Sequence, residues 1–241
     1  MDHRLLLESL LARWDRHAPI SDDDKDALIV LPWSTRTFGR DAYLVREGEP
    51  TSVCMLLTSG IAFRQKLVNH GARQIISFHI PGEFLDIQNA VLTVADHNVQ
   101  ALTRISVAVI QKAPLLDLMA TRPEIRRAIW RDSLIDSSIF REWVVNVGRR
   151  DARARIAHLL CELADRLKQS KGADGMPYDF PVTQEQIADA TGLTAVHTNR
   201  TLQALRKEEL IRLSSSQLSI LDWDALCEIG DFNERYLHHG G

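Results

Sequence analysis

Apolar and polar positions alternate with two different periods along the chain. From about residue 30 to residue 111 the period is two, in short runs that glycines separate at roughly ten-residue intervals, as in an antiparallel sandwich or jelly-roll barrel. The runs are STRTF, AYLVR, SVCMLLTSG, IAFRQKLV, RQIISFHI, NVQALT and ISVAVI. The dividing glycines are Gly39, Gly48, Gly60, Gly71 and Gly82. We therefore predict an all-β domain over this region.

The period changes to that of a helix after this region. Pro114 and Pro123 bracket a short helix, LLDLMATR, and Pro123 opens a long helical pattern that breaks at Gly148. A second helix, DARARIAHLLCELADRLKQ, follows, then a polar loop, SKGADGMP, and a short strand, YDFPV. The first residues, MDHRLLLESLLARWDRHAP, form a short amphipathic pattern.

The long helix carries an apolar stripe. Its members are Ile125, Ile129, Phe140, Val144 and Val147. The stripe has two explanations: the helix packs on its own β-domain, or it pairs with the same helix of a second subunit, as a spacing of three and four permits. We favour the pairing and expect a homodimer.

Residues 183 to 211, TQEQIADATGLTAVHTNRTLQALRKEELI, have the pattern of two short helices joined by a glycine turn. Thr183 and Gln186 form a capping box, and Thr194 can cap the second helix, each cap contributing about 1 kcal/mol. Gly192 supplies the turn, and small Ala188 lets the helices approach closely. The inner face is expected at Ile187, Leu193, Leu202 and Leu205. This arrangement is typical of a helix-turn-helix, although an αα-hairpin that merely packs has similar caps.

The second helix offers side chains suited to reading DNA. Val196, Asn199 and Arg200 lie at i, i+3 and i+4, near the end that enters a major groove. Arg200 matches guanine, Asn199 can pair with adenine, and Val196 can touch a thymine methyl. Ala195 belongs to the same surface, and phosphate contacts are expected from Gln184, Thr194, His197, Arg206 and Lys207. The segment LIRLSSSQLSIL follows as a hairpin, and DWDALCEIG as a last helix.

Composition narrows the class further. The chain has 241 residues, 45% of them hydrophobic, which favours two domains. A net charge of -3 argues against coating nucleic acid by bulk charge but permits a local basic face. We expect a cytoplasmic protein without a membrane partner, because no apolar run approaches the ~20 residues of a membrane span. Cys54, Cys161 and Cys227 are widely spaced, which supports neither a disulfide framework nor a metal cluster.

Three stretches together resemble the Crp/Fnr superfamily of bacterial transcription regulators over nearly the whole chain. They are RQIISFHIPGEFLD, WVVNVGRRDARARIAHLLCELADRL and the helix-turn-helix above. The resemblance implies an α+β chain with a β-roll sensor domain like cyclic-nucleotide-binding domains (residues 1–122, with flanking helices), a dimerisation helix (123–147) and a winged helix-turn-helix (148–241). It also implies a palindromic operator in double-stranded DNA and RNA polymerase as a further partner.

Departures from the family pattern matter for the signal. Where cAMP-binding members have glycine-glutamate and then arginine-serine, this chain has Asp86 and Ile87, then His97 and Asn98. We expect these four residues and Asp96 to line an effector pocket unsuited to cAMP, since Asp86 would repel a phosphate, so that a neutral or cationic ligand, or none, is expected instead. Asp96 and His97 could equally cap a turn. No cysteine precedes Cys54, so an iron-sulfur cluster is not expected. The family's glutamate, serine and arginine readers correspond to Val196, Asn199 and Arg200, so only the arginine is retained.

Two other functions compete with a signal-sensing regulator. His79 and Glu83 suggest a cupin-type metal-dependent enzyme with a helical appendage, but the H-x-H pair of such sites is missing because residue 77 is Ser77. Nor is there a nucleophile or phosphate-cradling motif, so we expect neither an enzyme nor a bound metal. Haem stays open as a cofactor, with Cys54, His79 and His97 as candidate axial ligands. The remaining alternative is a constitutive regulator without an effector.

Overall fold

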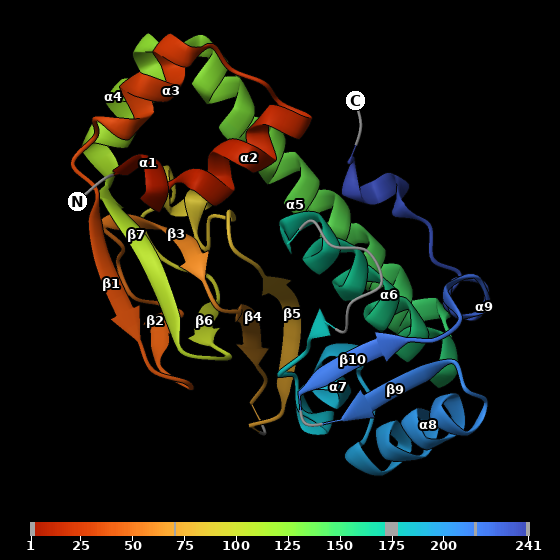
Figure 1. Ribbon diagram of the computed structural model, residues 1–241. Helices are drawn as coiled ribbons and strands as arrows, with labels where there is room; N and C mark the ends of the chain where they lie inside the picture. The colour runs from red at the N-terminus through yellow and green to blue at the C-terminus, as the bar shows by residue number, and fades with distance from the viewer. Residues whose placement is uncertain (1–2, 70, 172–177, 215, 240–241) are drawn as a thin grey trace. The chain divides into compact units, whose positions relative to one another are not determined.

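The computed structural model describes residues 3–69, 71–171, 178–214 and 216–239. The chain forms two compact units (Figure 1). The first comprises Met1–Gln65, Phe78–Ser138 and Leu237–Gly241, and the second comprises Lys66–Ser77 and Ile139–Tyr236. The predicted polar loop SKGADGMP lies mostly outside the described residues.

Within the described residues, seven strands build the β-roll, and each coincides with one of the predicted runs. They are β1 (Ser34–Phe38), β2 (Tyr43–Val45), β3 (Val53–Ser59), β4 (Ala62–Leu67), β5 (Arg73–His79), β6 (Asn98–Ala101) and β7 (Ile105–Gln111). They form two antiparallel sheets, in the orders β1-β7-β3 and β2-β6-β4-β5. The predicted double-sheet architecture is therefore confirmed.

Both faces of the β1-β7-β3 sheet are covered. On β3, Met55 and Leu57 point into the space between the two sheets, whereas Cys54 and Leu56 point to the opposite side. This follows from the two-residue period of a strand. Met55 and Leu57 belong to the core between the sheets, whereas Cys54 and Leu56 belong to the core between this sheet and the helices. The sequence of β3 is therefore almost continuously apolar.

Helices cover the outer face of that sheet within the first unit (Figure 1). They are α1 (His3–Leu6), α2 (Glu8–His17), α3 (Asp22–Ile29), α4 (Lys112–Thr121) and the first turns of α5 (Pro123–Arg149), and the short 3-10 helix η1 (Ile87–Ala90) lies nearby. Trp14 of α2 is fully buried and donates its Nε1 hydrogen to Asp132 Oδ2 of α5 at 2.8 Å. Arg13 pairs with the same carboxylate at 3.0 Å. The amphipathic N-terminal pattern is thus an integral part of the β-roll core.

The predicted stripe of the long helix divides along its length. Ile125 and Ile129 are buried in the core of their own unit, with exposed fractions of 0% and 3%. A partner helix cannot reach them, which corrects the expectation that both lie in a dimer interface. Phe140 and Val144 are exposed, and Val147 is half-buried. The helix continues through Gly148 and ends one residue later.

The second unit is built around α6 (Ala152–Lys171), which packs against α7 (Gln184–Thr191), α8 (Ala195–Lys207) and α9 (Trp223–Gly230). A small antiparallel sheet in the order β8-β10-β9 completes it, from β8 (Tyr178–Asp179), β9 (Ile211–Ser214) and β10 (Gln217–Ile220). The 3-10 helix η2 (Glu234–Leu237) follows α9. The predicted short strand, hairpin and last helix are all present. Among the described helices, none combines the length and apolarity that crossing a bilayer requires.

Candidate functional site

The segment α7–turn–α8 has the local geometry that its sequence predicts. Thr183 Oγ1 accepts from the Gln186 amide at 3.2 Å, and Gln186 Oε1 accepts from the Thr183 amide at 2.9 Å, which closes the capping box. Gly192 ends α7 with φ 65°, a left-handed conformation that glycine adopts without strain. Thr194 then caps α8 by accepting from the His197 amide. The chain therefore turns sharply and starts α8 in a fixed direction.

Helix α8 has one buried and one exposed face. Thr198, Thr201, Leu202 and Leu205 are buried, and Ile187 of α7 is fully buried with them. Of the predicted inner residues, only Leu193 is less than buried. The opposite face carries Val196, Arg200, Gln203 and Lys207, all exposed. Their spacing of four, three and four residues aligns them in one row, which we call the reading face.

Other predicted DNA contacts lie around the reading face. Ala195 and His197 are exposed in the first turn of α8, close to Thr194, whose hydroxyl is already engaged as the cap. Asn199 is half-buried and donates from Nδ2 to Gln184 Oε1 at 2.7 Å, which ties α8 to the start of α7. Arg206 is also half-buried. This bond engages the Nδ2 donor of Asn199 and the Oε1 acceptor of Gln184 with each other.

Sequence reasoning missed two exposed residues beside these groups. Gln203 lies on the reading face one turn after Arg200, and the i, i+3, i+4 spacing that selected Arg200 could have found it. Arg212 is exposed on β9, at the base of the hairpin that flanks the helix-turn-helix in the same unit. In the sequence, Arg212 is a single arginine in a short strand, and such a residue does not by itself predict a DNA contact.

A buried arginine marks the interior of the β-roll. Arg64 of β4 donates from Nε and Nη2 to the Leu85 carbonyl oxygen at 3.1 and 3.0 Å, and from Nη1 to Asp136 of α5. All three guanidinium nitrogens therefore have protein acceptors. The same charge, after burial itself, lowers the pKa of His79 and of His97, which favours the neutral imidazoles.

The five residues predicted to line an effector pocket face different partners. Asp86 is fully buried and accepts from the Met55 amide at 2.8 Å, and burial raises its pKa to about 7. His97 is buried with Nδ1 2.6 Å from Asp96 Oδ1, while Asp96 itself is exposed. Asn98 Oδ1 accepts from the Glu47 amide, and Ile87 is half-buried in η1.

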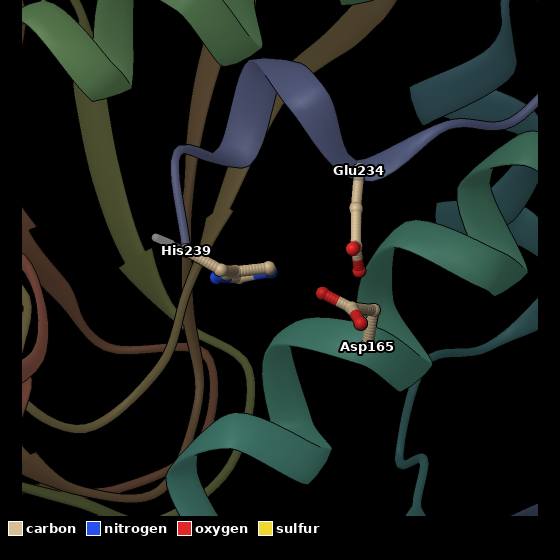
Figure 2. A group of neighbouring side chains, drawn as sticks. All are labelled: Asp165, Glu234 and His239. Carbon is tan, nitrogen blue, oxygen red and sulfur yellow. The ribbon is translucent and has the colours of Figure 1, made fainter. Parts of the chain in front are cut away.

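Two carboxylate side chains, those of Asp165 and Glu234, lie close together in the second unit. Figure 2 shows Asp165 on α6 and Glu234 at the start of η2 with their side chains turned toward one another. His239 is drawn with them but belongs to the other compact unit. Two carboxylates alone do not define a metal site, because a bound cation needs further ligands.

The capped helix-turn-helix, its exposed reading face and the adjoining hairpin define a DNA-binding regulator of the winged helix-turn-helix class. Residues 154–229 match the model of the Crp-like helix-turn-helix domain, and residues 35–122 match that of the cyclic nucleotide-binding domain. The nitrogen fixation regulation protein FixK of Bradyrhizobium diazoefficiens is 32% identical over 166 residues, which cover 68% of each chain. The chain belongs to the Crp/Fnr family of transcription regulators.

Other relatives agree with this assignment. The transcriptional activator protein FnrL of Cereibacter sphaeroides is 27% identical over 199 residues, covering 80% of this chain and 79% of that protein. Among solved structures, FixK2 from Bradyrhizobium japonicum has a TM-score of 0.76 at 22% identity, covering 83% of this chain and 98% of the other. The predicted family, fold and regulator class are confirmed.

Residues 35–122 match a domain that is named for binding cyclic nucleotides, but the residues present do not fit such a ligand. A cyclic phosphate needs a cation, but the arginine buried in the described part of this unit, Arg64, already has acceptors on all its nitrogens. Asp86 adds a carboxyl group, and neutral His97 and Asn98 stand at the positions of the arginine-serine pair. The structure therefore gives this domain the fold of a nucleotide-binding domain without its phosphate chemistry.

Proposed function

We propose that the chain acts as a homodimer that binds a two-fold symmetric DNA site with the reading face of α8 in the major groove. The observation that carries this proposal is the reading face itself: Val196 is 73% exposed and Arg200 is exposed beside it, on a helix whose start is capped by Thr194. Arg200 is assigned to guanine and Val196 to a thymine methyl. Asn199 contacts a base only if it releases or shares Gln184.

The remaining assignments concern the DNA backbone. The Thr194, Ala195 and His197 segment lies at the N-terminus of α8, where backbone N–H groups favour a phosphate. Lys207, Arg206 and Gln184 are proposed as further phosphate contacts, and Gln203 joins the base-reading set. Phosphate contacts set the position on the duplex but carry little sequence information, so their loss should weaken binding to all DNA alike.

The homodimer is proposed through α5. Large apolar side chains are exposed along one broad side of this helix: Trp130 at 66%, Leu134 at 54%, Phe140 at 49%, Val144 at 54% and Val145 at 44%. A contiguous exposed apolar stripe of this kind is typical of a helix–helix interface. We include Val147, which is half-buried, and leave out Ile125 and Ile129.

The β-roll is proposed as the sensor of a signal that is not cAMP. Because the domain buries the Asp86 carboxyl group and keeps His97 neutral, a neutral or cationic effector suits it better than an anionic one. The protein would shift between two dimer states only if the effector binds them unequally. We propose neither an enzymatic activity nor a resident cofactor. We propose that the regulator acts in the cytoplasm and contacts RNA polymerase. Its similarity to the transcriptional activator protein FnrL supports a role in transcription.

A selection of DNA from a random pool tests the DNA proposal directly. Purified full-length protein is mixed with random duplexes, and the retained DNA is sequenced over several rounds. A dimer with two reading heads should enrich an inverted repeat whose half-sites lie about one helical turn apart, ~10 base pairs. Enrichment of no sequence, or of a single asymmetric element, would contradict the proposal.

Arg200→Ala then tests the assignment of the reading face. The variant should lose about 1–3 kcal/mol of binding to the selected site and accept any base pair at one position of each half-site. Arg36→Ala, which removes an exposed arginine from β1 of the β-roll, serves as the matched control and should bind like the parent chain. An equal loss on selected and unrelated DNA would reassign Arg200 to a phosphate.

A further inference from the structure

Two of the three cysteines meet inside the second unit. Cys161 lies in α6 and Cys227 in α9, 66 residues further along the chain, and their Sγ atoms are 3.8 Å apart. Cys161 is buried, whereas Cys227 is half-buried and reachable from solvent. A disulfide bond is about 2.05 Å long, so a shift of roughly 2 Å, shared between two side chains, would join them.

The backbone holds the two thiols at this separation. Gly230 lies one turn after Cys227, and a Cβ atom there would come within 2.7 Å of the His158 amide nitrogen and 3.0 Å of the Ala157 carbonyl carbon. The Gly230 carbonyl oxygen is 3.0 Å from His158 Nδ1. Ala157 and His158 precede Cys161 by one turn of α6, so the same close helix crossing places the thiols opposite each other.

The two thiols also differ in reactivity. Their mutual hydrogen bond lowers the pKa of Cys227 and raises that of Cys161, which burial raises further. Burial of Cys227 and nearby carboxylates, Asp224 first among them, oppose the lowering without reversing it. Burial raises the pKa of the Cys54 thiol to about 12. Cys227 is also the more exposed of the two sulfurs, so a solute in water reaches it before Cys161, and burial disfavours the thiolate of Cys54.

We infer that Cys161 and Cys227 form an oxidation site at which hydrogen peroxide converts the chain to an intrachain disulfide. The Cys227 thiolate attacks one peroxide oxygen; an S–O bond forms, the O–O bond breaks, and hydroxide leaves and becomes water by taking up a proton. Cys161 then loses its proton and attacks the Cys227 sulfenic acid, so that the S–S bond forms and the hydroxyl group leaves as water. Two thiols and one peroxide give one disulfide and two waters, and a small thiol reverses the bond by exchange.

The test is peptide mapping of the reduced full-length chain before and after equimolar hydrogen peroxide. Remaining thiols are alkylated in denaturant, and the chain is digested with trypsin. We expect residues 156–166 and 213–235 to appear as one linked peptide, lighter than their sum by two hydrogen atoms, and to separate after dithiothreitol. The peptide of residues 47–64, which holds Cys54, should stay fully alkylated and is the internal control. Alkylation of Cys161 and Cys227 after peroxide, or sulfinic acid without the link, would overturn the inference.

Two variants assign the order of the steps. Cys161→Ser removes the second thiol, so peroxide should leave a sulfenic acid on Cys227 that dimedone traps. Cys227→Ser should leave Cys161 as an unmodified thiol at the same dose. A dimedone adduct on Cys161 in the second variant, with none on Cys227 in the first, would refute the assignment of Cys227 as the attacking sulfur. All of these experiments measure peptide masses and none measures DNA binding. A negative result would therefore overturn the oxidation site without affecting the DNA-binding proposal.

Discussion

Asp86→Asn should make the stability of the β-roll less dependent on pH between about 4 and 7. Asp86 is fully buried beneath β3, and burial raises its pKa from the ordinary 3.8 to about 7, although the Met55 amide and the charge of Arg64 oppose the shift. Between these two values the folded chain holds a proton that the unfolded chain has released. Stability therefore falls as pH rises through this window, because the unfolded state is the one that loses the proton more readily.

The magnitude follows from the two pKa values. A difference of about 3 pK units corresponds to about 4 kcal/mol of lost stability once the pH exceeds about 7. At about pH 5 only about 1–2 kcal/mol of that loss is present, so about 2–3 kcal/mol appears between pH 5 and pH 8.5. Asparagine keeps the acceptor for the Met55 amide and cannot ionise, so the variant resembles protonated Asp86 at every pH.

Urea unfolding at a series of pH values measures this effect. The free energy of unfolding of Asp86→Asn minus that of the parent chain should increase by about 2–3 kcal/mol from about pH 5 to about pH 8.5. Asp117→Asn, which removes an exposed carboxylate from α4 of the same unit, is the control and should give a difference independent of pH. A constant difference for Asp86→Asn as well would refute the reasoning.

Three further predictions follow from the described contacts. Val144→Asp, on the exposed side of α5, should convert the dimer to a monomer in sedimentation equilibrium while leaving the far-UV circular dichroism unchanged; an unaltered dimer would remove α5 from the interface. Trp14→Phe should lower the urea stability by about 1–3 kcal/mol because Asp132 loses a buried donor, and an unchanged midpoint would count against that bond. Thr183→Ala should lower the stability by about 1 kcal/mol and Thr183→Ser should recover most of it, whereas equal losses would argue against a hydroxyl cap.

Features set by neighbouring residues were predictable from the sequence. The strands follow from alternation and the glycines between them, and Thr183, Gly192 and Thr194 act within three residues of their own position. These determinants are local, so a linear pattern contains them. The reading face could be predicted for the same reason, since residues three and four apart share a side of any helix.

Features that depend on packing between distant elements were not predictable. His79 is only 2% exposed, although strand alternation places it on the side of β5 opposite to the buried Phe78. The 118-residue separation of Trp14 and Asp132, and the 66-residue separation of the two thiols, leave no linear signal. The period of an amphipathic helix shows that a face is apolar but not what covers it, and this is why Ile125 and Ile129 were assigned to a partner.

The burial of Trp14 has a practical consequence for dissecting this protein. The recognisable nucleotide-binding fold covers residues 35–122. The core between its β1-β7-β3 sheet and the helices also contains Leu7, Leu10 and Trp14, which precede this range in the sequence, and Ile125 and Ile129, which follow it. A fragment trimmed to the limits of the recognisable fold would expose that core to water and should aggregate. Sensor fragments for ligand screening must therefore start near His3 and continue beyond Asp132, so that the excised piece keeps its own apolar lining.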